Sequence, residues 1–161
     1  MAYSSVSYVL MTSLQIEREA SLSLHYRGRK DSHRFKLEGA YDLGAWQPRL
    51  ALLYARGAAS SGWAVQGRIR WTPSERLQLD LLADAFDASS WDSRLYTLTP
   101  MLRGEYGATL LYGKGAVLGG RVRYRLSSHW QIEGRVQHEH QQSDVRPTKT
   151  LFALSLRYRG W

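Results

Sequence analysis

Two of the five histidines in this sequence have a spacing that metal ligands can use. His138 and His140 are two residues apart, so on a β-strand both side chains share one face and Glu139 lies on the other. The pattern supplies no third ligand, and we interpret both as interfacial side chains. A Ser–His–acid set could be assembled from Ser155, His25 and several carboxylates, but chance provides such sets in a polar, strand-rich chain. We predict no catalytic residue, and the residues favour a protein that is not an enzyme.

Cofactor motifs give no positive signal either. Cysteine is absent from the sequence, which excludes thiolate metal sites and disulfides. Gly113-Lys114-Gly115 is not a phosphate loop, because the G-x-x-x-x-G-K-[ST] pattern does not occur and no helix is expected after it. The sequence therefore predicts no metal and no cofactor.

Basic residues give the chain a formal net charge of +8. In a soluble domain such a charge would point to nucleic acid. Here most basic side chains alternate with apolar ones along predicted strands, so we expect no nucleic-acid partner. One basic cluster surrounds a predicted loop and is a candidate contact for lipopolysaccharide phosphates, with a solvated loop as the alternative. Its members are Arg27, Arg29, Lys30 and Arg34.

The elements that position these side chains are predicted to be β-strands, because polar and apolar residues alternate with a period of two. The apolar residues of each stretch fall on one face, and charged residues fall on the other. Segments 20–27, 34–42 and 49–56 continue the strand pattern, although the last is apolar on both faces. The clearest stretches are 63–71, 77–85, 118–126, 130–140 and 150–159.

The charged face predicts a network of opposite charges inside a barrel. Antiparallel neighbours would place Arg68 and Arg70 beside two aspartates, and the three arginines of 118–126 beside two glutamates. The candidate lumen network consists of Arg68, Arg70, Asp80, Asp84, Arg121, Arg123, Arg125, Glu133, Arg135 and Glu139.

These strands have the length that a bilayer requires. No apolar run approaches the roughly 18 residues of a transmembrane helix, whereas about ten residues with one apolar face match a tilted strand. The ten Tyr and six Trp suit a lipid–water interface. We predict one domain over 1–161, an all-β antiparallel transmembrane barrel of about 10–12 strands; a soluble sandwich or lipocalin-like barrel is the alternative. The candidate aromatic girdle is Trp63, Trp71, Tyr124, Trp130 and Tyr158.

Tight and long connections alternate along the chain. Since outer-membrane barrels place short turns in the periplasm, the last strand should descend to a periplasmic C-terminus. Tight turns are predicted at 42–48, 72–76 and 127–129, and longer loops at 27–33, 57–62, 87–93 and 141–149.

The stretch 94–116 does not follow this scheme. Pro100 and several glycines predict bends, bulges or a tightly curved wall there. The literal count is eleven strands, and a complete single-chain barrel is expected to have an even number. The C-terminal part of a larger barrel is therefore the alternative to a whole one. Residues 1–10 lack a secretory signal, which predicts a mature, recombinant or truncated chain.

Three motifs follow one another in the second half of the chain: S-R-L-Y-T-L-T-P at 93–100, L-Y-G-K-G at 111–115 and R-V-R-Y-R-L at 121–126. This ordered set resembles the C-terminal barrel of a family of Bacteroidota outer-membrane proteins that usually carry helix-hairpin-helix repeats upstream. The match covers about 93–161. It implies a Gram-negative outer-membrane barrel, and the DNA role associated with the absent repeats does not carry over.

The sequence thus favours a structural or accessory outer-membrane protein that acts through partner proteins or lipid contacts. Its alternatives are a small pore and a lipid-modifying outer-membrane enzyme. Acids interleaved with the arginines favour a lumen filled by side chains over a conducting one. The expected partners are outer-membrane lipid or lipopolysaccharide, and another membrane protein chain along an open barrel edge.

Overall fold

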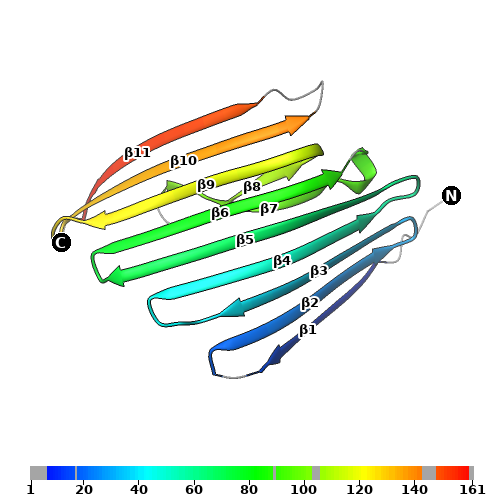
Figure 1. The fold of residues 1–161 in the computed structure, drawn as a ribbon, viewed down its shortest axis with the longest axis horizontal. Helices are drawn as coiled ribbons and strands as arrows, with labels where there is room; N and C mark the ends of the chain where they lie inside the picture. The colour runs from blue at the N-terminus through cyan, green and yellow to red at the C-terminus, as the bar shows by residue number, and fades with distance from the viewer. Residues whose placement is uncertain (1–6, 17, 89, 103–105, 143–147, 160–161) are drawn as a thin grey trace.

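The computed structural model describes residues 7–16, 18–88, 90–102, 106–142 and 148–159. Within these ranges the chain forms eleven β-strands and one short 3-10 helix, η1, and the strands pair antiparallel (Figure 1). The all-β antiparallel class is confirmed, and so is the literal count of eleven. The elements are β1 (Ser7–Gln15), β2 (Ala20–Arg29), β3 (Ser32–Tyr41), β4 (Trp46–Arg56), β5 (Ser61–Ser74), β6 (Leu77–Ala88), η1 (Trp91–Ser93), β7 (Leu95–Pro100), β8 (Tyr106–Leu111), β9 (Gly113–Arg125), β10 (Trp130–Gln142) and β11 (Lys149–Tyr158).

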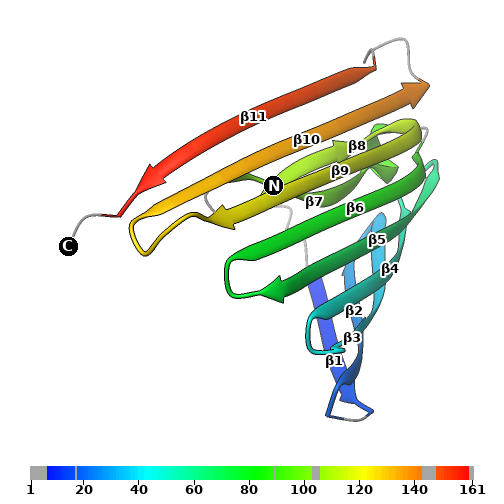
Figure 2. The same ribbon diagram turned by 60° about the vertical axis from the view of Figure 1, so that its left-hand side comes forward.

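Nine of these strands form one curved sheet, which we call the wall. Its order is β1-β2-β3-β4-β5-β6-β9-β10-β11, so the wall follows the chain except where β7 and β8 are left out. The curve is open: β1 and β11 are its two edges and lie apart (Figure 2). The structure therefore shows a curved antiparallel sheet and does not show a closed barrel.

The wall has two distinct ends. One, the turn end, carries the connections 42–45, 75–76 and 126–129. The opposite loop end carries 57–60 and η1. The long loop predicted at 27–33 is wrong, because β2 runs to Arg29 and β3 begins at Ser32. The charged residues of 27–33 fit a strand with one polar face, so they do not require a loop.

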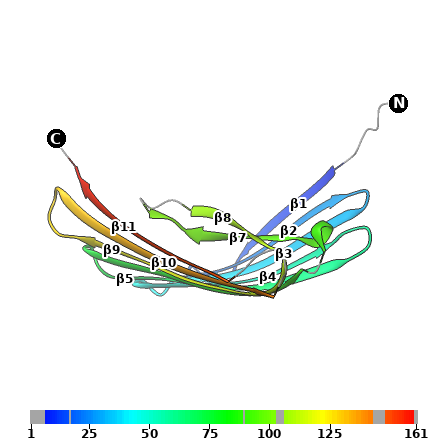
Figure 3. The ribbon, with the colours of Figure 1, turned by 90° about the horizontal axis from the view of Figure 1, so that it is seen from above.

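Strands β7 and β8 form a hairpin that pairs with no other strand and lies within the hollow of the wall (Figure 3). Behind it, β6 and β9 pair continuously from Leu77↔Tyr124 to Ala88↔Gly113. The prediction that 94–116 belongs to a bent or tightly curved wall is therefore wrong for β7 and β8, whereas 113–116 do lie in the wall as the start of β9. The residues of β7 alternate as a strand does, but the face with Leu95 and Thr97 is buried against the wall.

Each wall strand separates its side chains between two faces. On β6, Leu81 and Ala83 face the convex side and are exposed, whereas Asp80 and Asp84 face the hollow and are buried. Near the loop end, apolar side chains replace charges on the concave face and pack against the base of the hairpin. This core cluster comprises Ala55, Ala64, Leu82, Phe86, Leu95, Leu111 and Val117. The core thus lies between the wall and the hairpin, and it fixes the hairpin inside the hollow.

The described residues contain no helix that is both long and apolar enough to cross a membrane.

Candidate functional site

The concave face of β5, β6 and β9 is organised around one buried carboxylate. Asp80 Oδ1 accepts a hydrogen bond from Arg70 Nε at 2.8 Å, and Asp80 Oδ2 accepts one from Arg121 Nε at 3.0 Å. Gln78 Nε2 donates to the same Oδ2 at 2.9 Å. The Arg121 side chain is only 1% exposed and that of Asp80 only 7%. Burial makes this pairing important, since a buried charge without its partner is costly.

Arg121 and Arg68 also form contacts that reach from the wall to the hairpin. Arg121 Nη1 donates to the backbone oxygen of Met101 at 2.8 Å. Arg68 Nη1 donates to Asp84 Oδ1 at 2.8 Å, and its Nη2 bonds the hydroxyl of Thr97. Each guanidinium therefore neutralises a wall carboxylate and holds the hairpin at the same time, which the five donors of an arginine permit.

A second charge group lies on β9 and β10. Arg123 Nε donates to Glu133 Oε1 at 2.9 Å. Arg135 and Glu139 do not meet directly, because both bond the amide of Gln137, which lies between them on the same face. Arg125 is exposed at the turn end, so it lies outside the buried group.

Sequence alternation therefore placed the charged residues on the correct face, but not all of them beside the right partners. Arg121 meets Asp80 on β6 where a glutamate on β10 was expected. The reason is that β6 and β9 are neighbours in the wall although 24 residues separate them in the sequence. Alternation placed Gln66 and Gln137 on the polar face but gave them no part in the network. It gave no signal for Met101, whose contact with Arg121 depends on the inward hairpin.

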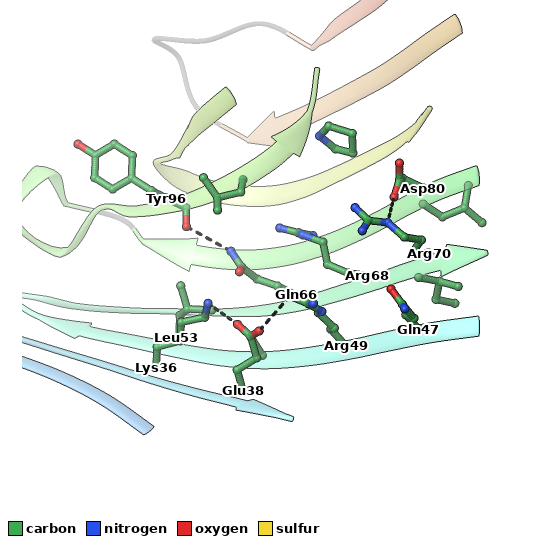
Figure 4. A pocket seen from close by; sticks show the side chains of 15 residues that line it. Lys36, Glu38, Gln47, Arg49, Leu53, Gln66, Arg68, Arg70, Asp80 and Tyr96 are labelled. Carbon is green, nitrogen blue, oxygen red and sulfur yellow. Dashed lines mark hydrogen bonds and ion pairs between the residues drawn. The ribbon is translucent and has the colours of Figure 1, made fainter. Parts of the chain in front are cut away.

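A cavity of about 460 Å³ opens between the hairpin and the concave face of β3–β6 (Figure 4). Lys36, Arg49, Arg68 and Arg70 line it, against two carboxylates, Glu38 and Asp80. These side chains give the cavity a formal charge of +2. Arg49 is the cation with the weakest pairing among them, with Nη1 3.9 Å from Glu38 Oε1 and 57% of its side chain exposed. The cavity therefore combines apolar lining residues with a positive formal charge.

The predicted girdle residues lie near the strand ends. At the turn end, Trp71 stacks on Trp46 with ring centroids 5.0 Å apart, and Trp130 packs on Tyr158 at the same distance. Tyr124 lies at this end too, whereas Trp63 lies near the loop end beside its cross-strand partner Tyr54. The Trp63–Trp71 separation along β5 is about 26 Å at 3.3 Å per residue.

The four residues of the basic cluster at β2–β3 do not lie together: two are on the concave side of the wall, and two are at the end of β2 and in the turn after it. Arg27 and Arg34 are cross-strand partners and line a cavity with Leu95 and Tyr96, which places them on the concave side. Arg29 ends β2 and Lys30 lies in the turn. A lipopolysaccharide contact by this cluster stays a prediction.

The two spaced histidines bond neighbouring threonines on the convex side. His138 Nδ1 lies 2.8 Å from Thr150 Oγ1, and His140 Nδ1 lies 3.0 Å from Thr148 Oγ1. In the described part of the chain, no three His, Asp or Glu residues gather as a metal site would require.

At the loop end, Asp92 ties η1 to the 57–60 connection. The Ser60 hydroxyl, a bond involving Ser90 and the Ala59 amide, which donates at 3.2 Å, hold the pKa of Asp92 well below its ordinary value. Gly57 allows this approach, because a Cβ there would stand 2.2 Å from Asp92 Oδ2. Asp92 thus fixes the first turn of the segment that leads into the hairpin.

The Asp92 contact predicts a pH dependence. A lowered carboxyl pKa stabilises the folded loop above the ordinary value near 3.9, and this contribution declines as the pH falls below about 4. Hydrogen exchange of the 57–62 peptide should therefore be slow at pH 6 and lose protection in stronger acid. Asp92→Ala should remove the protection at every pH, whereas Asp42→Ala at the turn end should leave it unchanged. Protection that is equal in Asp92→Ala and the unchanged chain would contradict this role.

No protein-family model matches the sequence, and no curated protein matches it. Among solved structures the chain is similar to the NanC porin in its rhombohedral crystal form, at a TM-score of 0.46 and 13% identity. The similarity covers 96% of this chain and 74% of that one. At these values it assigns no function.

Proposed function

We propose that this chain forms wall strands of a transmembrane β-barrel in a Gram-negative outer membrane, with a structural or accessory role. The observation that carries the proposal is the separation of the two faces of the wall. Exposed apolar side chains cover the convex face, and buried ion pairs cover the concave face. A soluble sheet protein covers its apolar face with a second layer and turns its charges outward.

The convex face is also too large and too apolar for a face exposed to water. Soluble monomers rarely expose contiguous apolar patches above a few hundred Å². Here every wall strand contributes exposed apolar or aromatic residues, among them Leu24, Leu52, Leu81, Leu118 and Leu154. Aromatic residues at the strand ends match interfacial girdles. At a strand tilt of about 40°, the stretch of about 26 Å between Trp63 and Trp71 covers about 20 Å of membrane depth, which lies within the apolar band of about 25 Å.

The proposed orientation places the turn end in the periplasm, as short turns favour. β11 then descends, and the C-terminus lies in the periplasm. The resemblance of 93–161 to the barrels of Bacteroidota outer-membrane proteins supports the outer membrane as the location.

Membrane insertion is tested by refolding the purified chain with phosphatidylcholine vesicles and floating the vesicles on a density gradient. The chain should float, show β-structure by circular dichroism, and have its tryptophan fluorescence quenched by lipids brominated on the acyl chain. A chain that is folded, monomeric and soluble without detergent or lipid would overturn the proposal.

The electropositive cavity supports a second candidate, a small pore that prefers anions. Replacing Lys36 and Arg49 by Glu changes the formal charge of the cavity from +2 to −2. In planar bilayers with a KCl gradient, the reversal potential should change sign from anion to cation preference. Arg76→Glu, in an exposed turn, serves as the control and should leave the sign unchanged. Bilayers that contain the inserted protein and show no discrete conductance would remove the pore candidate.

A further inference from the structure

The two edge strands of the wall run in the same direction. Eight antiparallel pairings connect β1 to β11, and each reverses the strand direction. Both edges therefore run from the loop end to the turn end. If β1 and β11 paired directly, the seam would be parallel, unlike every other pair in the wall. An all-antiparallel closure requires an odd number of additional strands, as the even strand numbers of outer-membrane barrels imply.

β1 carries none of the residues that protect free edges, and β11 carries charges only near its two ends, Lys149 and Arg157. Sheet proteins block open edges with proline, charged residues, bulges or very short strands. β1 is nine residues long, Ser-Tyr-Val-Leu-Met-Thr-Ser-Leu-Gln, and contains neither a charge nor a proline. The middle of β11, Thr150–Leu156, contains none either. These strands have the composition of strands that are paired on both sides.

The exposure of side chains at the two edges is what we expect if each edge strand lacks one neighbouring strand. All nine residues of β1 are exposed on both faces. Phe152 and Leu154 of β11 are each 78% exposed, compared with 54% for Leu118 in the interior of the wall. An apolar side chain facing lipid still packs against neighbours on both adjacent strands, and the edge residues lack one of these.

A second copy of this chain does not satisfy these edges. Two copies inserted in the same orientation would place β11 beside β1 of the other copy, which is again a parallel seam. An inverted copy would give antiparallel seams, but its turn end would lie on the opposite side of the membrane.

We propose that the edges of β1 and β11 bind an amphipathic antiparallel β-segment with an odd number of strands, which is not a second copy of this chain and completes the barrel wall. This inference rests on the proposed membrane function. The strand of the segment that pairs with β1 and the one that pairs with β11, which are the same strand if only one is missing, run from the turn end to the loop end. Its outward residues are apolar. Its inward residues beside β1 are mainly uncharged, because Ser7, Val9, Met11 and Ser13 on that side carry no charge.

The parity of the missing strands can be tested with extended forms of the full chain. The first form adds a copy of residues 126–142 after residue 159. This copy contains a tight turn and one strand that runs from the turn end to the loop end. In the matched control, a copy of 126–158 adds two strands, so the last one descends like β1. Since the natural chain has no cysteine, Leu10→Cys in β1 and one outward-facing cysteine in the last added strand report their contact.

The one-strand extension should form the intramolecular disulfide and a compact band on unheated SDS gels, and the two-strand extension should form neither. Disulfide formation is also measured in the unextended chain, which has no added strand. Leu10→Cys combined in turn with a cysteine at Phe152, Leu154 or Leu156 should give neither an intramolecular disulfide nor a disulfide-linked dimer.

An intramolecular disulfide in the unextended chain would show parallel self-closure and overturn the inference. A disulfide-linked dimer would overturn it in favour of a second copy, and equal closure by both extensions would overturn the parity argument. The same samples are floated with vesicles beforehand. A chain that floats and closes on itself fails this inference alone, whereas a chain that does not float fails the proposed function as well.

Discussion

Leu118→Arg should destabilise the membrane-folded chain by about 2–4 kcal/mol, the cost of an arginine on the lipid-facing side near the bilayer midplane. Leu118 lies in the middle of β9, on the convex face, and is 54% exposed. In water, an arginine at such an exposed site would change stability by less than about 0.5 kcal/mol. The substitution therefore distinguishes lipid from water at the convex face.

The matched control is Leu126→Arg, immediately after the same strand at the turn end. Leu126 is 49% exposed, close to the value for Leu118, but lies at the level of the aromatic residues Tyr124 and Trp130. Near the interface the cost should fall to about 0–1 kcal/mol. The free energy of unfolding of both variants is measured in vesicles by urea titration, with tryptophan fluorescence as the signal. Equal and negligible effects of the two substitutions would show that the convex face meets water.

Asp80→Ala should cost about 3–5 kcal/mol, the usual effect of removing one member of a buried ion pair. The substitution removes the carboxylate that pairs with both Arg70 and Arg121. Arg121 is almost fully buried, so water cannot replace the lost partner. Because Arg121 also bonds Met101, the hairpin should loosen together with the wall. Protease cleavage between β7 and β8 should then become faster in the folded protein.

Glu75→Ala, in the exposed turn between β5 and β6, is the control and should change stability by less than about 0.5 kcal/mol. Asp80→Asn adds a second comparison, since it keeps the size of the side chain and removes only the charge. If Asp80→Ala and Glu75→Ala had the same effect, the ion pairs would not hold the concave face.

Much of the wall follows from the sequence alone, because the period of two has a direct physical consequence. Successive side chains of a strand point to opposite faces, so the alternation of Leu81 and Asp80 fixes which residues face the hollow wherever a strand forms. The tight turn around Ser127 and His129 is equally local: Ser127 Oγ accepts hydrogen bonds from the backbone N–H groups of His129 and Trp130. Fold class, strand number and the two faces are therefore encoded locally.

The tertiary structure decided what depends on contacts distant in the sequence. Alternation is the same in β7 as in a wall strand, so it could not show that the 95–111 hairpin turns inward. That outcome depends on apolar residues at concave positions, such as Leu82 and Phe86, meeting Leu95 and Leu111. The pairing of Asp80 with Arg121 follows from the same event, because removing the hairpin from the wall makes β6 and β9 neighbours. The tertiary structure also decided that the wall has nine strands and two separate edges. The common direction of these edges does not depend on the hairpin, because nine and eleven are both odd numbers of antiparallel strands.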